Sequence, residues 1–251
     1  MIKVLLLVFF MINFPSKATT LEVVFEHNPP FQMIDENGNG YGPVYDFAIK
    51  LITHAQLAVR LNGKPWARIM VKDAKKPNTL ILSISKIPQR IPNFIWLTSV
   101  YTGQPYIWRK RNAIDPKNKS IQVSMERNSH REKSIKEYFH SDNVFEFLNS
   151  TQALNALLKG RVQRFVATTF AVSGKLASLG YELNILEQLS LFDEAEFSSQ
   201  GLYLTLTLGT DKEIQLALKQ ALKHPEIIEA RNSLFDSFHK EEQALLRSQS
   251  K

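Results

Sequence analysis

The run from Thr79 to Ile84 constrains the fold more than any other segment, because apolar residues follow one another in it with almost no polar alternation. A strand with one solvated face alternates apolar and polar residues, whereas a strand buried on both faces is apolar throughout. Strands of the second kind occur in parallel sheets that helices cover on both sides. The run therefore predicts a buried strand in a mainly parallel sheet.

Strand and helix signals alternate along the rest of the chain. Leu21–Phe25 and Leu57–Leu61 are rich in strand formers, and apolar residues recur between them at helical spacing after Pro43. This alternation predicts an α/β fold, and 251 residues suffice for one large domain or two small ones. Further strands are expected at 121–125, 165–168 and 202–208, and further helices at 66–73, 129–139, 150–158, 214–222 and from 225, with a loose polar tail from 240.

Local signals mark several helix starts. Ser129–Glu132 and Thr210–Glu213 both have the Ser/Thr-x-x-Glu pattern of a capping box, in which two side chains satisfy free N–H groups of the first turn. Ser150 is the predicted cap of a further helix, and Gly160 marks the end of that helix.

The residue types present exclude several kinds of chemistry. The chain has no cysteine, so thiolate nucleophiles, cysteine-ligated zinc and iron–sulfur clusters are excluded. The six histidines show no metal-motif spacing, and there is no phosphate loop and no Gly-x-Ser-x-Gly turn. We therefore predict no metal, no other cofactor and no enzymatic activity.

The N-terminus reads as a secretory signal peptide covering residues 1–18. Lys3 precedes an apolar run from Val4 to Ile12, which Pro15 ends too early for a membrane span. Ser16 and Ala18 place small residues three and one before the expected cleavage. Without a cysteine to carry a lipid anchor, the mature chain is expected to be free in a bacterial periplasm.

The formal net charge of +7 is concentrated in one stretch. Between Arg109 and Lys136 there are nine basic and three acidic residues. Such a stretch either forms a solvated face or attracts an anionic molecule. Because no nucleic-acid recognition motif accompanies it, we predict no nucleic-acid partner.

A series of short motifs then identifies a family. In order along the chain they are Asn28-Pro29-Pro30-Phe31, Pro65-Trp66-Ala67-Arg68, Ser83-Ile84-Ser85, Arg90 and Phe94-Ile95-Trp96. With these motifs the chain resembles the bacterial extracellular solute-binding proteins of family 3, the periplasmic receptors that feed polar amino-acid ABC transporters. The resemblance covers nearly the whole mature chain.

The resemblance implies a two-lobed periplasmic-binding-protein type II fold, with mixed, mainly parallel sheets and two hinge strands. The first lobe would comprise residues 19–104 and 201–251, and the second lobe residues 105–200. A small-molecule ligand would lie between the lobes, the protein would act as a monomer, and its partner would be an ABC permease in the inner membrane.

The first lobe supplies most of the implied ligand contacts. Arg90 would hold a ligand carboxylate with its planar guanidinium. Ser83 and Ser85 would contact the ligand or serve as ordinary turn residues. Asn28 takes the approximate place of an aromatic residue that faces the ligand in the family, and Phe31 would be either a contact or a core residue.

The second lobe matches the family less well. Ser129 would bind an anion at the start of a helix or only cap that helix. Thr168 stands where amino-acid receptors place a carboxylate against the ligand ammonium, and a hydroxyl supplies no charge there. We therefore expect weak binding of ordinary α-amino acids and a preference for carboxylates without a free amine, unless Glu26 or Asp46 replaces the missing partner.

Three classes of function follow. The main hypothesis is a non-enzymatic receptor that closes around a small carboxylate-bearing, amino-acid-like solute for ABC-type uptake. The alternatives are a ligand-sensing partner of a membrane signalling protein and an enzyme built on the same scaffold.

Overall fold

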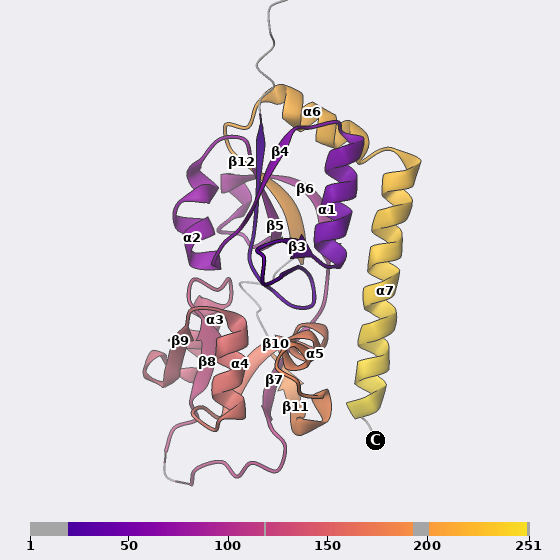
Figure 1. Ribbon diagram of the computed structural model, residues 1–251. Coiled ribbons are helices and arrows are strands. Elements are labelled where there is room, and N and C mark those ends of the chain that lie inside the picture. The colour runs from indigo at the N-terminus through magenta and orange to yellow at the C-terminus, as the bar shows by residue number, and fades with distance from the viewer. Residues whose placement is uncertain (1–19, 118, 193–200, 250–251) are drawn as a thin grey trace, which may run out of the picture.

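Two five-stranded sheets, each flanked by helices, make up most of the described chain (Figure 1). The computed structural model describes residues 20–117, 119–192 and 201–249, so the predicted signal segment at 1–18 lies outside the described residues. The strands of the first sheet fall within residues 21–101 and 202–207, and those of the second within 105–191. No helix among the described residues combines the length and apolarity needed to cross a membrane.

In spatial order the first sheet contains β4 (Val59–Gly63), β1 (Leu21–Phe25), β5 (Thr79–Ser85), β12 (Leu202–Thr207) and β6 (Phe94–Tyr101). The second contains β11 (Leu186–Leu191), β7 (Pro105–Lys110), β10 (Arg164–Thr168), β8 (Val123–Glu126) and β9 (Val144–Phe147). A small hairpin pairs β2 (Met33–Ile34) with β3 (Gly40–Tyr41). The helices are α1 (Pro43–His54), α2 (Trp66–Val71), α3 (Glu132–Phe139), α4 (Ser150–Leu158), α5 (Thr169–Ser178), α6 (Lys212–Ala221) and α7 (Pro225–Gln249).

The central strand β5 is the apolar run singled out in the sequence, and all seven of its residues are buried. It pairs parallel with β1 and antiparallel with β12. The second sheet repeats this arrangement, since β10 pairs parallel with β8 and antiparallel with β7. Both sheets are therefore mixed, and the residues at the carboxyl ends of β1, β5, β8 and β10 line one cavity between the lobes.

Helix α7 corrects one prediction. It begins at Pro225, as expected from the preference of proline for the first turn, but it continues through the polar segment that we expected to be loose from Lys240. The tail is helical because its apolar side is covered: Leu245 packs against the cores of both lobes. Figure 1 shows α7 running along α1 and on to α5, so it connects the two lobes from outside.

The predicted capping boxes do not form. Ser129 and Thr210 lie before the helices rather than at the N-cap positions, which are Arg131 for α3 and Asp211 for α6. Neither N-cap side chain accepts a capping hydrogen bond. Helix α4 is capped by Asn149, one residue earlier than predicted. The patterns identified residues able to cap, whereas packing decided where each helix begins.

Four aromatic rings meet where the two lobes join. Phe31 comes from the first lobe, Tyr101 from the end of β6, Phe170 from α5 in the second lobe and Phe238 from α7. All six pairs of ring centroids lie between 4.7 and 5.9 Å apart. Because edge and tilted contacts at these separations are favourable, the cluster holds both lobes and α7 together.

We expect Phe238→Ala to lower the free energy of unfolding by about 3 to 5 kcal/mol, since it leaves a cavity among the other three rings. Phe238 is only 3% exposed. Leu216→Ala is the matched control, because Leu216 is 57% exposed on α6 and its loss should change stability by less than about 0.5 kcal/mol. Urea unfolding of both variants would measure the difference, and equal stabilities would show that α7 is not a structural link.

Candidate functional site

A cavity of about 420 Å³ lies between the lobes. Its walls come from the loops after β1 and β5 in the first lobe and from the ends of β8 and β10, the start of α3 and one side of α5 in the second. Ligands of open α/β sheets bind beyond the carboxyl ends of parallel strands, which is where this cavity lies. Its volume is that of a pocket for a small molecule.

The cavity brings together all the ligand-contact candidates identified in the sequence. Its lining includes Asn28, Phe31, Ser83, Ser85, Arg90, Ser129 and Thr168. The position of each side chain is thus compatible with the predicted role, but several of these groups are already engaged within the protein.

Arg90 is the first-lobe cation of the cavity. Its guanidinium lies over the ring of Trp66 at 5.3 Å, and its Nη atoms make only long contacts of 3.4 and 3.5 Å with the backbone oxygens of Ser85 and Asn128. Burial lowers the pKa of Arg90 to about 10, so the group stays positive at neutral pH. The charges of Glu26 and Glu126 act on it, but among the described residues no salt bridge engages its guanidinium, which leaves the paired N–H groups available for an anionic ligand group.

The two serines of the first lobe are held by internal bonds. Ser83 has a φ of 54°, unusual for a strand residue, and its Oγ donates to Oε1 of Gln32 at 2.6 Å. Ser85 Oγ lies 3.0 Å from Nδ1 of His130 and so connects the first lobe to the second. Backbone strain of this kind persists where surrounding structure enforces it, often at ligand sites.

The remaining predicted contacts also have structural partners. Thr168 Oγ1 accepts a hydrogen bond from the N–H of Ala171 at 3.3 Å and thereby caps α5. Ser129 Oγ accepts from the N–H of Arg131 at 3.2 Å. Phe31 belongs to the aromatic cluster described above, so its structural role is established by packing.

Two carboxyl groups, one from each lobe and within hydrogen-bonding reach of each other, were missing from the predicted site. Glu26 directly follows β1 in the first lobe, and Glu126 is the last residue of β8 in the second. Burial and the charge of Glu126 raise the pKa of Glu26 well above its usual range, and burial raises the pKa of Glu126 to about 7. Oε1 of Glu126 is buried without a hydrogen-bond partner among the described residues.

A lysine and a histidine complete the cluster. Lys175, buried on α5, donates to Oδ1 of Asn28 at 2.8 Å and to the backbone oxygen of Pro29 at 3.1 Å. Burial lowers the pKa of Lys175 to about 8. Burial also lowers the pKa of His130 well below its usual range, and its Nε2 has no partner among the described residues. The cavity thus presents cations and carboxyl groups together.

These carboxyl groups bear on the expectation drawn from Thr168, because Glu26 is one of the two replacements that the sequence left open. The sequence predicted weak binding of ordinary α-amino acids unless Glu26 or Asp46 replaces the missing carboxylate, and the structure places Glu26 in the cavity wall, next to Glu126. Asp46 is not part of the lining. Both glutamates directly end or follow a predicted strand, so the rule that ligands bind at strand carboxyl ends could have identified them.

The raised pKa of Glu126 makes a variant's stability depend on pH. The folded protein keeps the Glu126 carboxyl group protonated at pH values where the unfolded chain releases the proton. The stabilising contribution of this group to the free energy of unfolding is therefore fully present below about pH 4.5 and is lost as the pH rises through about 7. As the pH is raised from 5 to 7.5, the free energy of unfolding of Glu126→Gln should therefore increase relative to that of wild type, by on the order of 1 to 3 kcal/mol.

Urea unfolding of both proteins at the two pH values gives this difference, and comparison with wild type cancels the opposing contribution of His130. Glu137→Gln on the exposed side of α3 is the control, whose difference from wild type should not change with pH. A constant difference for Glu126→Gln would mean that Glu126 is ionised in the folded protein.

Comparison with solved structures places the fold. The chain is similar to a histidine kinase sensor domain with similarity to periplasmic binding proteins, with a TM-score of 0.71 and 14% identity over 86% of this chain and 93% of that chain. It is similar to a periplasmic His/Glu/Gln/Arg/opine family-binding protein from Silicibacter pomeroyi in complex with lysine, with a TM-score of 0.70 and 15% identity over 87% and 96% of the two chains.

A third similar structure is an amino acid ABC transporter substrate-binding protein from Streptococcus pneumoniae bound to L-arginine, with a TM-score of 0.68 and 16% identity over 89% and 95% of the two chains. No protein-family model and no curated protein matches the chain. At these identities the likeness establishes the fold, and the predicted two-lobed periplasmic-binding-protein architecture is confirmed.

Proposed function

We propose that the chain is a periplasmic receptor that closes its two lobes around a small solute carrying both a carboxylate and a positively charged group. The observation that carries this proposal is the cavity between the lobes, which contains Arg90 and Lys175 together with Glu26 and Glu126. A purely anionic ligand would leave the buried carboxylates without a cationic partner, and a purely cationic ligand would leave the buried cations without an anionic one. Burial of an unpaired charge is costly. A ligand that carries a negative and a positive group can pair with the cations and with the carboxylates at once.

The carboxylate is assigned to Arg90. A planar guanidinium binds a carboxylate through two parallel hydrogen bonds, and in this structure its present contacts are long backbone interactions that a ligand can replace. The indole of Trp66 supports the guanidinium from one face and fixes its orientation.

The positive group is assigned to the paired carboxyl groups of Glu26 and Glu126, which lie within hydrogen-bonding reach of each other. Burial raises the pKa values of both carboxyl groups, and the charge of Glu126 raises that of Glu26 further. A ligand ammonium or guanidinium entering this site would displace the proton and pair with the carboxylates. This assignment replaces the preference for amine-free acids that the sequence suggested.

Because one proton leaves when a cation binds, affinity should depend on pH. Below the pKa of Glu126 of about 7, the apparent dissociation constant should rise by up to about tenfold per pH unit. Protons bound or released can be counted by calorimetry in buffers of different ionisation enthalpy. Binding with no proton release at pH 6 would contradict the assignment.

The similar structures support a transport role. They include proteins described as bound to lysine and to L-arginine, one of them a component of an amino acid ABC transporter. By analogy, this chain would be exported, act as a monomer in the periplasm and deliver its ligand to an ABC permease in the inner membrane. The receptor would perform no chemistry, and a turnover assay that finds the bound ligand unchanged would support this.

Sensing is the second candidate function, favoured by the likeness to a histidine kinase sensor domain. The long helix α7 connects both lobes, so it would report their relative position to a partner that binds its outer surface. Uptake of labelled ligand in cells lacking this protein separates the two functions: unchanged uptake together with a lost transcriptional response would favour sensing.

A thermal-shift screen tests the ligand class. It should contain L-arginine, L-lysine and L-glutamine, matched acids without the amine, and matched amines without the carboxylate, such as agmatine. A ligand at 100 times its dissociation constant adds about 2.7 kcal/mol of stability, so binding is readily visible. We expect large shifts only for compounds with both groups. Shifts with amine-free acids alone would restore the expectation drawn from Thr168.

The role of Arg90 is tested by substitution. Arg90→Ala should weaken binding of the screened ligand by about 2 to 5 kcal/mol, because a buried carboxylate loses its partner. Arg60→Ala, at an exposed position on β4, is the matched control and should bind normally. Calorimetry would measure both affinities, and an unchanged affinity for Arg90→Ala would remove this residue from the site.

A further inference from the structure

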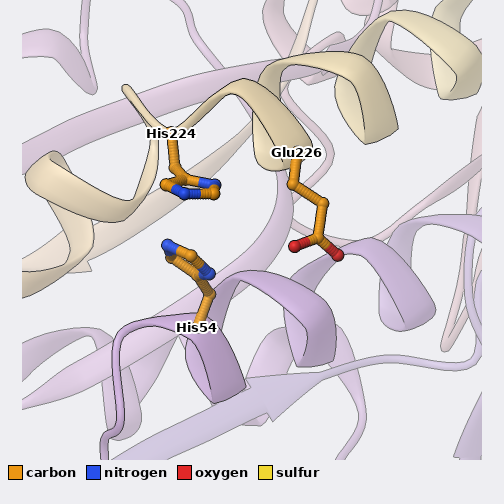
Figure 2. Close-up of side chains that lie close together, drawn as sticks. All are labelled: His54, His224 and Glu226. Carbon is orange, nitrogen blue, oxygen red and sulfur yellow. The ribbon is translucent and has the colours of Figure 1, made fainter.

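A second group of polar side chains lies outside the cleft, at the junction of α1 and α7. His54 is the last residue of α1, His224 immediately precedes α7, and Glu226 is in the first turn of α7. Figure 2 shows the two imidazole rings facing each other with the carboxylate of Glu226 beside them. One ligand atom from each of the three side chains lies within 4.8 Å of the others. None of the three residues lines the cavity between the lobes.

The backbone around these side chains is well held. The carbonyl oxygen of His224 accepts hydrogen bonds from the N–H groups of Ile227 and Ile228, both at 3.0 Å, and so begins the hydrogen-bond ladder of α7. His54 belongs to the last turn of α1, where its backbone N–H is within the helix. Helices α1 and α7 pack against each other, so the spacing of the three positions is set by the fold.

The side chains themselves are exposed and can adjust. The two ring centroids are 4.1 Å apart with an angle of 42° between the planes. Donor atoms bound to one tetrahedral zinc ion are about 3.3 Å apart, as follows from Zn–N distances of about 2.0 to 2.1 Å. All three side chains are exposed, and their ligand atoms already lie within 4.8 Å of one another, so binding requires the donors to approach by roughly 1.5 Å.

We propose that His54, His224 and Glu226 form a binding site for one divalent transition-metal ion, of the class of Zn²⁺, Cu²⁺ or Ni²⁺. Two imidazoles and one carboxylate are the ligand types these ions prefer when cysteine is absent, as it is in this chain. Three protein donors leave further coordination positions for water. The site is distinct from the ligand cleft and does not depend on the proposed receptor function.

A metal ion at this site would compete with a lysine side chain for the carboxylate of Glu226. Nζ of Lys50, one turn before His54 on α1, lies 2.9 Å from Oε1 of Glu226. Both side chains are exposed, and exposed ion pairs of this kind contribute little, so a metal can displace the ammonium from the carboxylate. The carbonyl end of α1 favours a cation at His54, while Glu226 offsets the positive end of α7.

Residues in this group are far apart in the sequence, which explains why the spacing of the histidines predicted no metal. A metal motif within one helix is visible as a short repeat, whereas His54 and His224 come together only when α7 packs on α1. The prediction of no metal therefore rested on local spacing, which carries no information about such a pair.

Calorimetry with Zn²⁺, added to metal-free, tag-free full chain in a non-chelating buffer, tests the site. We expect one ion per chain, with at least about a tenfold loss of affinity in His54→Ala, His224→Ala and Glu226→Gln. His239→Ala is the matched control, since His239 is an exposed histidine of α7 that instead contacts Gln243, and it should bind zinc normally. Circular dichroism confirms that each variant is folded.

Lys50→Gln distinguishes a metal site from an incidental contact of side chains. Removing the competing ammonium should increase the affinity for zinc several-fold. If the three side chains do not bind a metal, the zinc affinity of Lys50→Gln should equal that of wild type. Absorption of bound Co²⁺ gives an independent measure of nitrogen and oxygen ligation in the same variants. Failure to bind one ion per chain, or binding that survives both histidine substitutions, would overturn the proposal.

Discussion

The contact of four aromatic rings at the junction of the lobes is the interaction on which the rest of the structure depends. Phe31, Tyr101, Phe170 and Phe238 come from the first lobe, the strand leading to the second lobe, the second lobe and the C-terminal helix. Their packing brings the loop after β1 beside α5, where Lys175 donates to Asn28. In the same arrangement Glu26 of one lobe lies within hydrogen-bonding reach of Glu126 of the other. Two of the rings, Phe31 and Tyr101, also line the cavity, and Phe238 fixes α7 against both lobes.

The cavity between the two lobes buries carboxyl groups and cations together. Closing them removes carboxyl groups and cations from water at the same time, and burial therefore raises the pKa values of Glu26 and Glu126 and lowers those of Arg90 and Lys175. Opposite charges limit this cost but do not remove it, because their mutual hydrogen bonds are incomplete. Under the proposed function, a ligand with both signs would complete these bonds, and closure and ligand binding would then favour each other. The same balance would reject a simple acid or a simple amine.

Predictability differed between the elements for clear reasons. Strands β1 and β5 and the start of α1 were recoverable from local pattern, because β5 is buried on both faces and Pro43 suits only a first turn. Helix α5 was not predicted, since Gly174 lies within it and weakens its helical signal. The structure shows why glycine is there: a Cβ at this position would lie 2.4 Å from Pro30. The polar end of α7 was predicted to be loose because its partners, Tyr101 among them, are distant in sequence.

The sequence by itself determined the α/β class, the two-lobed architecture implied by its motifs, and a set of polar residues that do line one cavity. These features are encoded in periodicity and in short ordered motifs, which need no knowledge of distant contacts. Only the tertiary structure decided the chemical character of the site. Glu26 and Glu126 become a pair, and His54 approaches His224, because elements distant in the chain pack together. Charge pairing and pKa depend on distances of a few ångströms, and linear spacing does not contain those distances.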